Sequence, residues 1–202
     1  MNKPIIILGA GGHASVLADI AILLGRQILG LCNPIKALLN GFPNIAYLGN
    51  DDVLSQYDTS QVVLVNGLGA ISVQMNQQRR MLFQKFVDIG YQFETLIHPS
   101  AVVANSSQLG QGTQVMAGAI IQPNVIIKEN VIINTGSCVD HDCVISHSVH
   151  IAPRVVLSGN THLGENSMVG VGAVIIQGIK IEENTMIRAG SVVTKNILVP
   201  QD

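Results

Sequence analysis

Aliphatic residues recur at every sixth position through the second half of the chain. A helix repeats its apolar face at about 3.6 residues and a strand at about 2, so neither element alone produces a period of six. A parallel β-helix of hexapeptides does, because each hexad is one short strand plus a corner and three hexads complete a triangular coil. The seventeen aliphatic positions are Ile97, Val103, Leu109, Val115, Ile121, Ile127, Ile133, Val139, Ile145, Ile151, Leu157, Leu163, Val169, Ile175, Ile181, Ile187 and Val193.

Two other positions of the hexad keep the same register. Four residues after each aliphatic residue the side chain is mostly small, as the interior of a narrow prism requires. Three residues after it, Gly, Asn and Asp predominate, and these residues tolerate the left-handed backbone conformation of a tight corner. The small positions include Ala101, Ser107, Thr113, Ala119, Ser137, Cys143, Thr161, Ser167, Ala173, Thr185 and Ser191. The predicted corners are Gly112, Gly118, Asn124, Asn130, Gly136, Asp142, Asn160, Asn166, Gly172, Gly178, Asn184 and Gly190.

The first half of the chain lacks this register and alternates apolar strand patterns with helical ones. We expect an α/β Rossmann-like half domain with a small parallel sheet over residues 1–95, followed by the β-helix over residues 96–202. The segment Leu31–Tyr57 is expected to be mostly loop and turn. The predicted strands are Ile5–Leu8, Ile28–Cys32 and Val62–Val65, and the predicted helices are Ala14–Leu24, stopped by Gly25, and Ser72–Ile89, stopped by Gly90.

A glycine-rich turn joins the first strand to the first helix. Gly9-x-Gly11-x-x-Ala14 is typical of a phosphate cradle, because glycines admit the anion and a helix N-terminus presents free N–H groups. An NAD site needs an acidic residue about 20 positions further on, and Asn33 stands there instead. We therefore expect a site for one nucleotide diphosphate, with a purely structural turn as the alternative.

Charge and cysteine content narrow the function further. The formal charge of −2 argues against a general nucleic-acid or membrane-surface role. The three cysteines, Cys32, Cys138 and Cys143, show neither metal spacing nor a disulfide framework, which favours a reducing cytoplasm. The N-terminus lacks the basic region of a signal peptide, so a cytoplasmic location is expected.

Four motifs together resemble one family. They are Gly11-Gly12-His13, Ile97-His98-Pro99-Ser100-Ala101, Asn134-Thr135-Gly136 and Asp140-His141-Asp142-Cys143. The chain is similar to bacterial sugar O/N-acyltransferases, which include UDP-4-amino-sugar N-acetyltransferases and sialic acid O-acetyltransferases. The resemblance implies a left-handed β-helix and a homotrimer with active sites at subunit interfaces. It also implies acetyl-CoA bound between neighbouring β-helices, a nucleotide-linked sugar held by the N-terminal domain, and no metal.

The same resemblance implies roles for individual residues. His141 takes the place of the general base, and Asp142 that of the carboxylate that raises the proton affinity of the base. Implied acetyl-CoA contacts are His150, Val171 and Ala189, and implied nucleotide-sugar contacts are Gly11, Gly12, His13, Asn33, Asn66 and Gly67. Asn33-Pro34 stands where many members carry an acidic pair, so the preference for sugar or nucleotide is open.

The chemistry of acetyl transfer agrees with these roles. The attacking amine or hydroxyl must lose a proton, and a neutral imidazole can take it at cellular pH. His141 lies two residues after Val139 and should project outward, toward solvent or a neighbouring subunit. His150 is expected either to contact the coenzyme or to pack in the trimer, whereas Cys143 is expected in the core.

We therefore expect an acetyl-CoA-dependent N-acetyltransferase that acts on the 4-amino group of a nucleotide-linked deoxy sugar in surface-glycan synthesis. O-acetylation of sialic acid or another sugar is the alternative. Two remoter alternatives are a zinc hydratase resembling γ-class carbonic anhydrases and a non-catalytic trimeric scaffold. The hydratase would need three histidines around zinc, drawn from His141, His147, His150 and His162.

Overall fold

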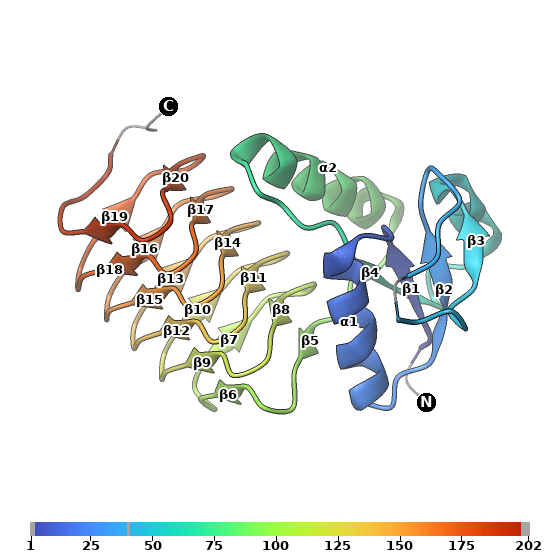
Figure 1. Ribbon diagram of the computed structural model, residues 1–202, viewed down its shortest axis with the longest axis horizontal. Helices are drawn as coiled ribbons and strands as arrows, with labels where there is room; N and C mark the ends of the chain where they lie inside the picture. Colours follow the sequence, from blue (N-terminus) through green and yellow to red (C-terminus); the bar gives the residue numbers. More distant parts are fainter. Residues whose placement is uncertain (1–2, 40, 199–202) are drawn as a thin grey trace.

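The computed structural model describes residues 3–39 and 41–198. A front α/β region, coloured blue to green in Figure 1, abuts one end of a stack of triangular coils. The first strand of the coils is β5, Leu96–Ile97. The predicted fold class, a Rossmann-like half domain followed by a parallel β-helix, is confirmed.

The front sheet contains four parallel strands in the order β3-β2-β1-β4. Its two faces carry different helices, because side chains alternate along β1. Ile5 and Ile7 pack against α1, and Ile6 and Leu8 pack against the side of α2. The elements are β1 Ile5–Leu8, α1 Gly12–Leu23, β2 Ile28–Cys32, β3 Tyr47–Gly49, β4 Val63–Asn66 and α2 Val73–Ile89.

The helices end where the sequence predicts. Gly25 and Gly90 take positive φ angles of 65° and 104° just beyond α1 and α2, which is the conformation of a glycine stop. Helix α2 begins after Ser72, whose side chain accepts a hydrogen bond from the N–H of Met75 at 3.2 Å. Helix α1 begins two residues earlier than expected, at Gly12 instead of Ala14.

The segment predicted to be mostly loop contains regular structure as well. Strand β3 pairs with the edge of β2, and a 3-10 helix covers Asp51–Gln56. Asn50 caps this helix by accepting a hydrogen bond from the N–H of Asp52 at 3.2 Å. Most of the segment is loop and turn as expected, but β3 was missed because a three-residue edge strand leaves no readable alternation, and its conformation comes from pairing with β2.

Three parallel sheets form the β-helix, and strands 18 residues apart pair in register, as Ile132 does with His150. The docking face meets the front region and contains β5, β8 Gln114–Val115, β11 Ile132–Ile133, β14 His150–Ile151, β17 Met168–Val169 and β20 Met186–Ile187. The open face contains β6 Val102–Val103, β9 Ile120–Ile121, β12 Cys138–Val139, β15 Val156–Leu157, β18 Val174–Ile175 and β21 Val192–Val193. The side face contains β7 Gln108–Leu109, β10 Ile126–Ile127, β13 Val144–Ile145, β16 His162–Leu163 and β19 Lys180–Ile181.

The corners confirm the reading of the hexad. All twelve predicted corner residues have positive φ angles. Ser148 and Arg154 share this conformation, with φ angles of 55° and 59°, although neither residue type favours it. Stacking between neighbouring coils therefore imposes the left-handed corner even where the residue type does not favour it.

One hydrophobic cluster joins the front region to the first coils of the β-helix, which also has a core of its own. Phe93 bridges to Leu64 at the edge of the front sheet. Leu96, Met116 and Ile132, from the first coils, belong to the same cluster as α1 and β1. Helix α2 also extends back along the coils (Figure 1), where buried Asn76 reaches Asn166.

Within the described residues, neither helix has the length and apolar character needed to cross a bilayer.

Candidate active site

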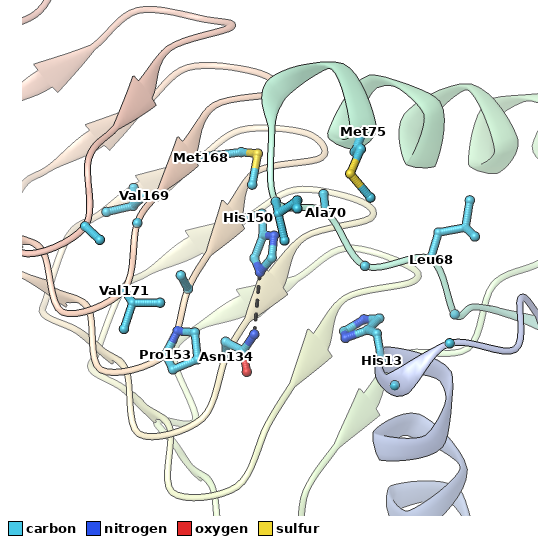
Figure 2. A pocket seen from close by; sticks show the side chains of 18 of the residues that line it. His13, Leu68, Ala70, Met75, Asn134, His150, Pro153, Met168, Val169 and Val171 are labelled. Carbon is cyan, nitrogen blue, oxygen red and sulfur yellow. Dashed lines mark hydrogen bonds between the residues drawn. The ribbon is translucent and has the colours of Figure 1, made fainter. Parts of the chain in front are cut away.

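A cavity of about 660 Å³ lies between the front region and the docking face of the β-helix. Figure 2 shows His13 and Leu68 on the front side and Asn134, His150, Met168 and Val171 on the β-helix side. The front region contributes Ala10, Gly11, Gly12, His13, Asn33, Gly67, Leu68, Gly69, Ala70, Ile71 and Met75. The β-helix contributes Asn134, His150, Ala152, Pro153, Met168, Val169, Gly170, Val171, Met186 and Ala189.

The glycine loop forms the front rim of this cavity. A Cβ built on Gly11 or Gly12 would meet nothing within 4 Å, so the backbone at the start of α1 is open to a ligand. Gly11 caps α1 without a side-chain hydrogen bond, which leaves N–H groups of the first turn free to bind an anion. Gly67 has the opposite reason to be glycine, because a Cβ there would lie 2.7 Å from the carbonyl oxygen of Leu8.

His13 stands at the first turn of α1 and joins the two regions. Its Nε2 lies 2.8 Å from Oε1 of Gln114 on the docking face. Burial lowers the pKa of His13 to about 4; the bond to Gln114 opposes this shift and the positive charge of Arg79 adds to it. The imidazole is therefore neutral at cellular pH.

His150 lies across the cavity from the glycine loop and is only 7% exposed. Its Nε2 is 3.5 Å from Nδ2 of Asn134, the contact drawn in Figure 2. Its Nδ1 is buried and has no hydrogen-bond partner among the described residues. Burial lowers the pKa of His150 to about 3, with smaller contributions in the same direction from Arg79 and His13. His150 is thus a second neutral imidazole.

His141 and Asp142 lie at a different corner of the prism, between β12 and β13, and do not line the cavity. His141 Nδ1 is 2.7 Å from Asp142 Oδ2, and both side chains are more than half exposed. The hydrogen bond with Asp142, aided by the charge of Asp140, raises the pKa of His141 above its usual value. The same bond lowers the pKa of Asp142.

The backbone around this pair is adapted to it. Asp142 has a positive φ of 59°, which turns its carboxylate back toward the preceding histidine. Asn124, one coil below, donates a hydrogen bond to the other carboxylate oxygen at 3.2 Å. One coil above, the imidazole lies against Gly159, where an added Cβ would be 2.6 Å from Cε1 of His141.

The remaining expected site residues divide into two groups. Val171, Ala189, Gly67 and Asn33 line the cavity. Asn66 does not, because it is 1% exposed and donates hydrogen bonds to the carbonyl of Arg79 and to Oδ1 of Asn130.

Sequence reasoning missed several cavity residues. Met168 and Met186 follow His150 at 18-residue intervals, which is one full coil, so they lie above it on the docking face. This spacing could have placed both residues beside His150 from the sequence. Together with Met75 of α2 they make one end of the cavity apolar. Leu68–Ile71 had no comparable signal, since only the docking of the front sheet brings this loop to the β-helix.

The described residues contain no group of three His, Cys, Asp or Glu side chains placed to hold a metal ion. Cys32 and Cys143 are buried free thiols, and burial raises the pKa of each to about 11. Cys143 lies inside the β-helix core, as predicted.

A hexapeptide β-helix that carries a glycine-loop α/β region, with a cavity between the two, defines the class of hexapeptide transferases. Two family models agree with this class. The bacterial transferase hexapeptide (six repeats) model matches residues 106–141 and 160–195, and the PglD N-terminal domain model matches residues 4–86.

Solved structures extend the likeness over nearly the whole chain. The acetyltransferase domain of PglB from Neisseria gonorrhoeae, in complex with acetyl coenzyme A, is 34% identical with a TM-score of 0.89. The match covers 98% of this chain and 93% of that one. PerB from Caulobacter crescentus, in complex with CoA and GDP-perosamine, is 33% identical with a TM-score of 0.89, over 100% of this chain and 93% of that one. No curated protein matches the sequence.

The chain belongs to the bacterial sugar acyltransferases that join a PglD-type N-terminal domain to a left-handed β-helix of hexapeptide repeats. It is accordingly an acyltransferase.

Proposed function

We propose that this protein transfers the acetyl group of acetyl-CoA to the 4-amino group of a nucleotide-linked deoxy sugar, for surface-glycan synthesis in the cytoplasm. The observation that carries the proposal is the cavity shared by the glycine loop and the docking face. One wall offers free N–H groups to a diphosphate, and the other lies on the scaffold that the relatives use for acetyl transfer. The relatives' complexes with acetyl-CoA and with GDP-perosamine support both substrates.

His141 is the proposed general base. The neutral imidazole takes a proton from the amine as the amine attacks the thioester carbonyl, and the bond to Asp142 stabilises the imidazolium that forms. The amide forms as the C–S bond breaks, and the proton passes to the leaving CoA sulfur, which departs as the free thiol. The transfer is direct in this proposal, since Cys143, which follows the Asp142 corner, is buried in the β-helix core and burial raises the pKa of its thiol.

The acetyl-CoA contacts that we propose are His150, Val171 and Ala189, on the β-helix wall of the cavity. The nucleotide sugar is assigned to the front wall, with Gly11, Gly12 and Gly67 around the diphosphate. Asn33 stands at the rim and His13 faces the β-helix. Asn66 acts from beneath, by holding the loop that follows β4.

We infer a homotrimer from the open face. Its outward positions form an apolar column, and an exposed apolar sheet face on a folded protein marks an interface. The column is Val102, Ile120, Cys138, Val156, Val174 and Val192. Four of these side chains are 36% to 66% exposed in the single chain. The open face separates the His141 corner from the corner at the cavity, so packing copies along it brings the base of one subunit toward the cavity of the next.

The test is the release of free CoA thiol from acetyl-CoA with a panel of acceptors. The panel contains UDP- and dTDP-4-amino-4,6-dideoxy sugars, GDP-perosamine and free sialic acid. Rapid release with one nucleotide amino sugar supports the proposal. Release with sialic acid alone moves the function to O-acetylation, and coenzyme binding without turnover excludes the acceptors tested.

His141→Ala is the companion variant. We expect turnover to fall by at least about 100-fold, the usual size of a general-base effect. The fold should remain, because the side chain is exposed. Near-normal turnover in this variant would contradict the assignment of the base.

A further inference from the structure

The amide of Gln114 has one orientation in this fold. Its Nε2 donates a hydrogen bond to the backbone carbonyl of Asn66 at 2.8 Å, and a carbonyl oxygen can only accept. The other end of the amide, Oε1, therefore faces His13 at 2.8 Å. Gln114 is 1% exposed, so water does not compete for either bond.

This orientation sets the tautomer of His13. Since Oε1 of Gln114 can only accept, Nε2 of His13 must carry the hydrogen. The depressed pKa of His13 means that the ring carries no second proton at cellular pH. Nδ1 is then a bare lone pair, and no side chain or backbone group of the described residues donates to it.

A bare lone pair selects its ligand. It attracts an O–H or N–H donor and repels the oxygens of a phosphate. The diphosphate of a nucleotide sugar is thus left to the backbone N–H groups of the glycine loop. His13 also faces the β-helix wall, toward Asn134 and His150 (Figure 2), where the sugar must lie if it is to be acetylated.

We propose that His13 binds the sugar of the nucleotide sugar as a hydrogen-bond acceptor, through Nδ1, from a hydroxyl or amino group. Gln114 is the positioning residue that fixes the tautomer. This inference rests on the proposed function and deepens it, because it assigns His13 to the sugar and not to the diphosphate.

Two substitutions separate the ring nitrogens. In His13→Asn, the side-chain oxygen can occupy the position of Nδ1, but the bond to Gln114 is lost. In His13→Gln, the longer amide can still donate to Gln114, but the acceptor at Nδ1 is lost. Binding is measured by calorimetry, with GDP-perosamine against GDP and a UDP-4-amino-4,6-dideoxy sugar against UDP.

We expect His13→Gln to weaken binding of the nucleotide sugar by about tenfold, the loss of one hydrogen bond in a partly buried site. His13→Asn should lose less, and neither variant should change the affinity for the nucleoside diphosphate. Gln114→Leu should weaken sugar binding as well. In combination with His13→Gln it should cause no further loss of affinity. Two results would overturn the proposal. One is that His13→Asn binds the nucleotide sugar more weakly than His13→Gln does. The other is that a variant loses as much affinity for GDP as for GDP-perosamine.

The pH dependence of binding is a second readout. The charged and titratable groups that face His13 are Arg79 and His150. A nucleotide sugar has no phosphate that titrates near neutrality, and the amino group of these probes stays protonated below about pH 7, so the affinity should be flat between pH 5.5 and pH 7. A loss of affinity with rising pH in the wild type that is absent in His13→Asn would identify a charged phosphate ligand and overturn the proposal.

His162→Gln is the matched control. His162 lies on the side face, away from the cavity, and should leave every affinity unchanged. Sugar-nucleotide binding with no acetyl transfer would defeat the proposed function alone. Equal behaviour of His13→Asn and His13→Gln would defeat the tautomer assignment alone, and failure of the wild type to bind any of the four probes would defeat both.

Discussion

At the scale of single residues, the His141–Asp142 pair connects a backbone conformation to a proton affinity. The left-handed φ at Asp142 allows two adjacent side chains to meet at 2.7 Å, which a β-strand would send to opposite faces. Asn favours this backbone conformation as well as Asp does. Asp142→Asn therefore changes the charge next to the proposed base, His141, and leaves the corner intact.

The pH profile of Asp142→Asn follows from the sign of the shift. The bond to Asp142 raises the pKa of His141, and the reactive form is the neutral ring, so activity falls as the pH drops through that raised value. Without the carboxylate, the pKa returns toward its ordinary value. We expect the acid limb of kcat/KM to move to lower pH and the plateau to fall by about tenfold or more. An unmoved limb would show that another group titrates.

Gly159 leaves the space that the imidazole of His141 occupies, because it has no side chain. A methyl group there would lie 2.6 Å from Cε1 and 2.7 Å from Nε2 of His141, so the ring must swing away. A misplacement of about 1 Å can cost about 100-fold in rate. We expect Gly159→Ala to lower kcat by at least about tenfold with little change in KM or melting temperature. In a His141→Ala background it should have no further effect, and an additive loss would mean that Gly159 acts in another way.

At the scale of elements, helix α2 is fixed to the coils by polar contacts. Asn76 is buried, and its Nδ2 donates to the carbonyl of Ser148 at 2.6 Å and to Oδ1 of Asn166 at 3.1 Å. Arg79, also buried, donates to the carbonyl of Asn130. The acceptors are corner residues with positive φ angles: Ser148, Asn166 and Asn130. The stacked corners therefore present the acceptor groups to which the side chains of α2 donate hydrogen bonds.

Asn76→Ala should therefore loosen the docking of α2. The substitution leaves buried acceptors without a donor, which costs about 1–3 kcal/mol of unfolding free energy. Chemical denaturation should reveal this loss, while Gln78→Ala, exposed on the same helix, should stay within about 0.5 kcal/mol of the wild type. Equal effects of the two variants would show that these bonds do not hold the helix.

These elements also show what a sequence can and cannot predict. The hexad register predicts twelve of the left-handed corners and the inward position of Cys143, because each coil repeats the same local constraint; Ser148 and Arg154 take the same conformation without a residue type that signals it. The His141–Asp142 pair is predictable because its members are neighbours. The cavity is less predictable from the sequence. Leu68–Ile71 and Met75 line it because the front region docks on the β-helix through contacts such as that of Gln114 with Asn66, and these contacts follow no sequence period. The burial of Asn66 has the same origin.

At the scale of the whole molecule, the single chain keeps the proposed base and the cavity apart. His141 stands at the corner between the open and side faces, and the cavity opens on the docking face. The proposed mechanism therefore requires two copies for each reaction. A closed cyclic trimer satisfies this requirement by repeating one interface three times.

Complementation of two inactive variants tests this arrangement. His141→Ala removes the base and keeps the cavity, whereas Gly11→Trp fills the cavity and keeps the base. Co-expressed with different tags and purified through both, the mixed trimers contain one interface in which an intact His141 faces an intact cavity. We expect about a third of wild-type turnover per trimer if each site draws on two subunits. If one subunit supplied both parts, every site of a mixed trimer would carry one of the two defects. An inactive mixture of stable trimers would therefore contradict the shared site.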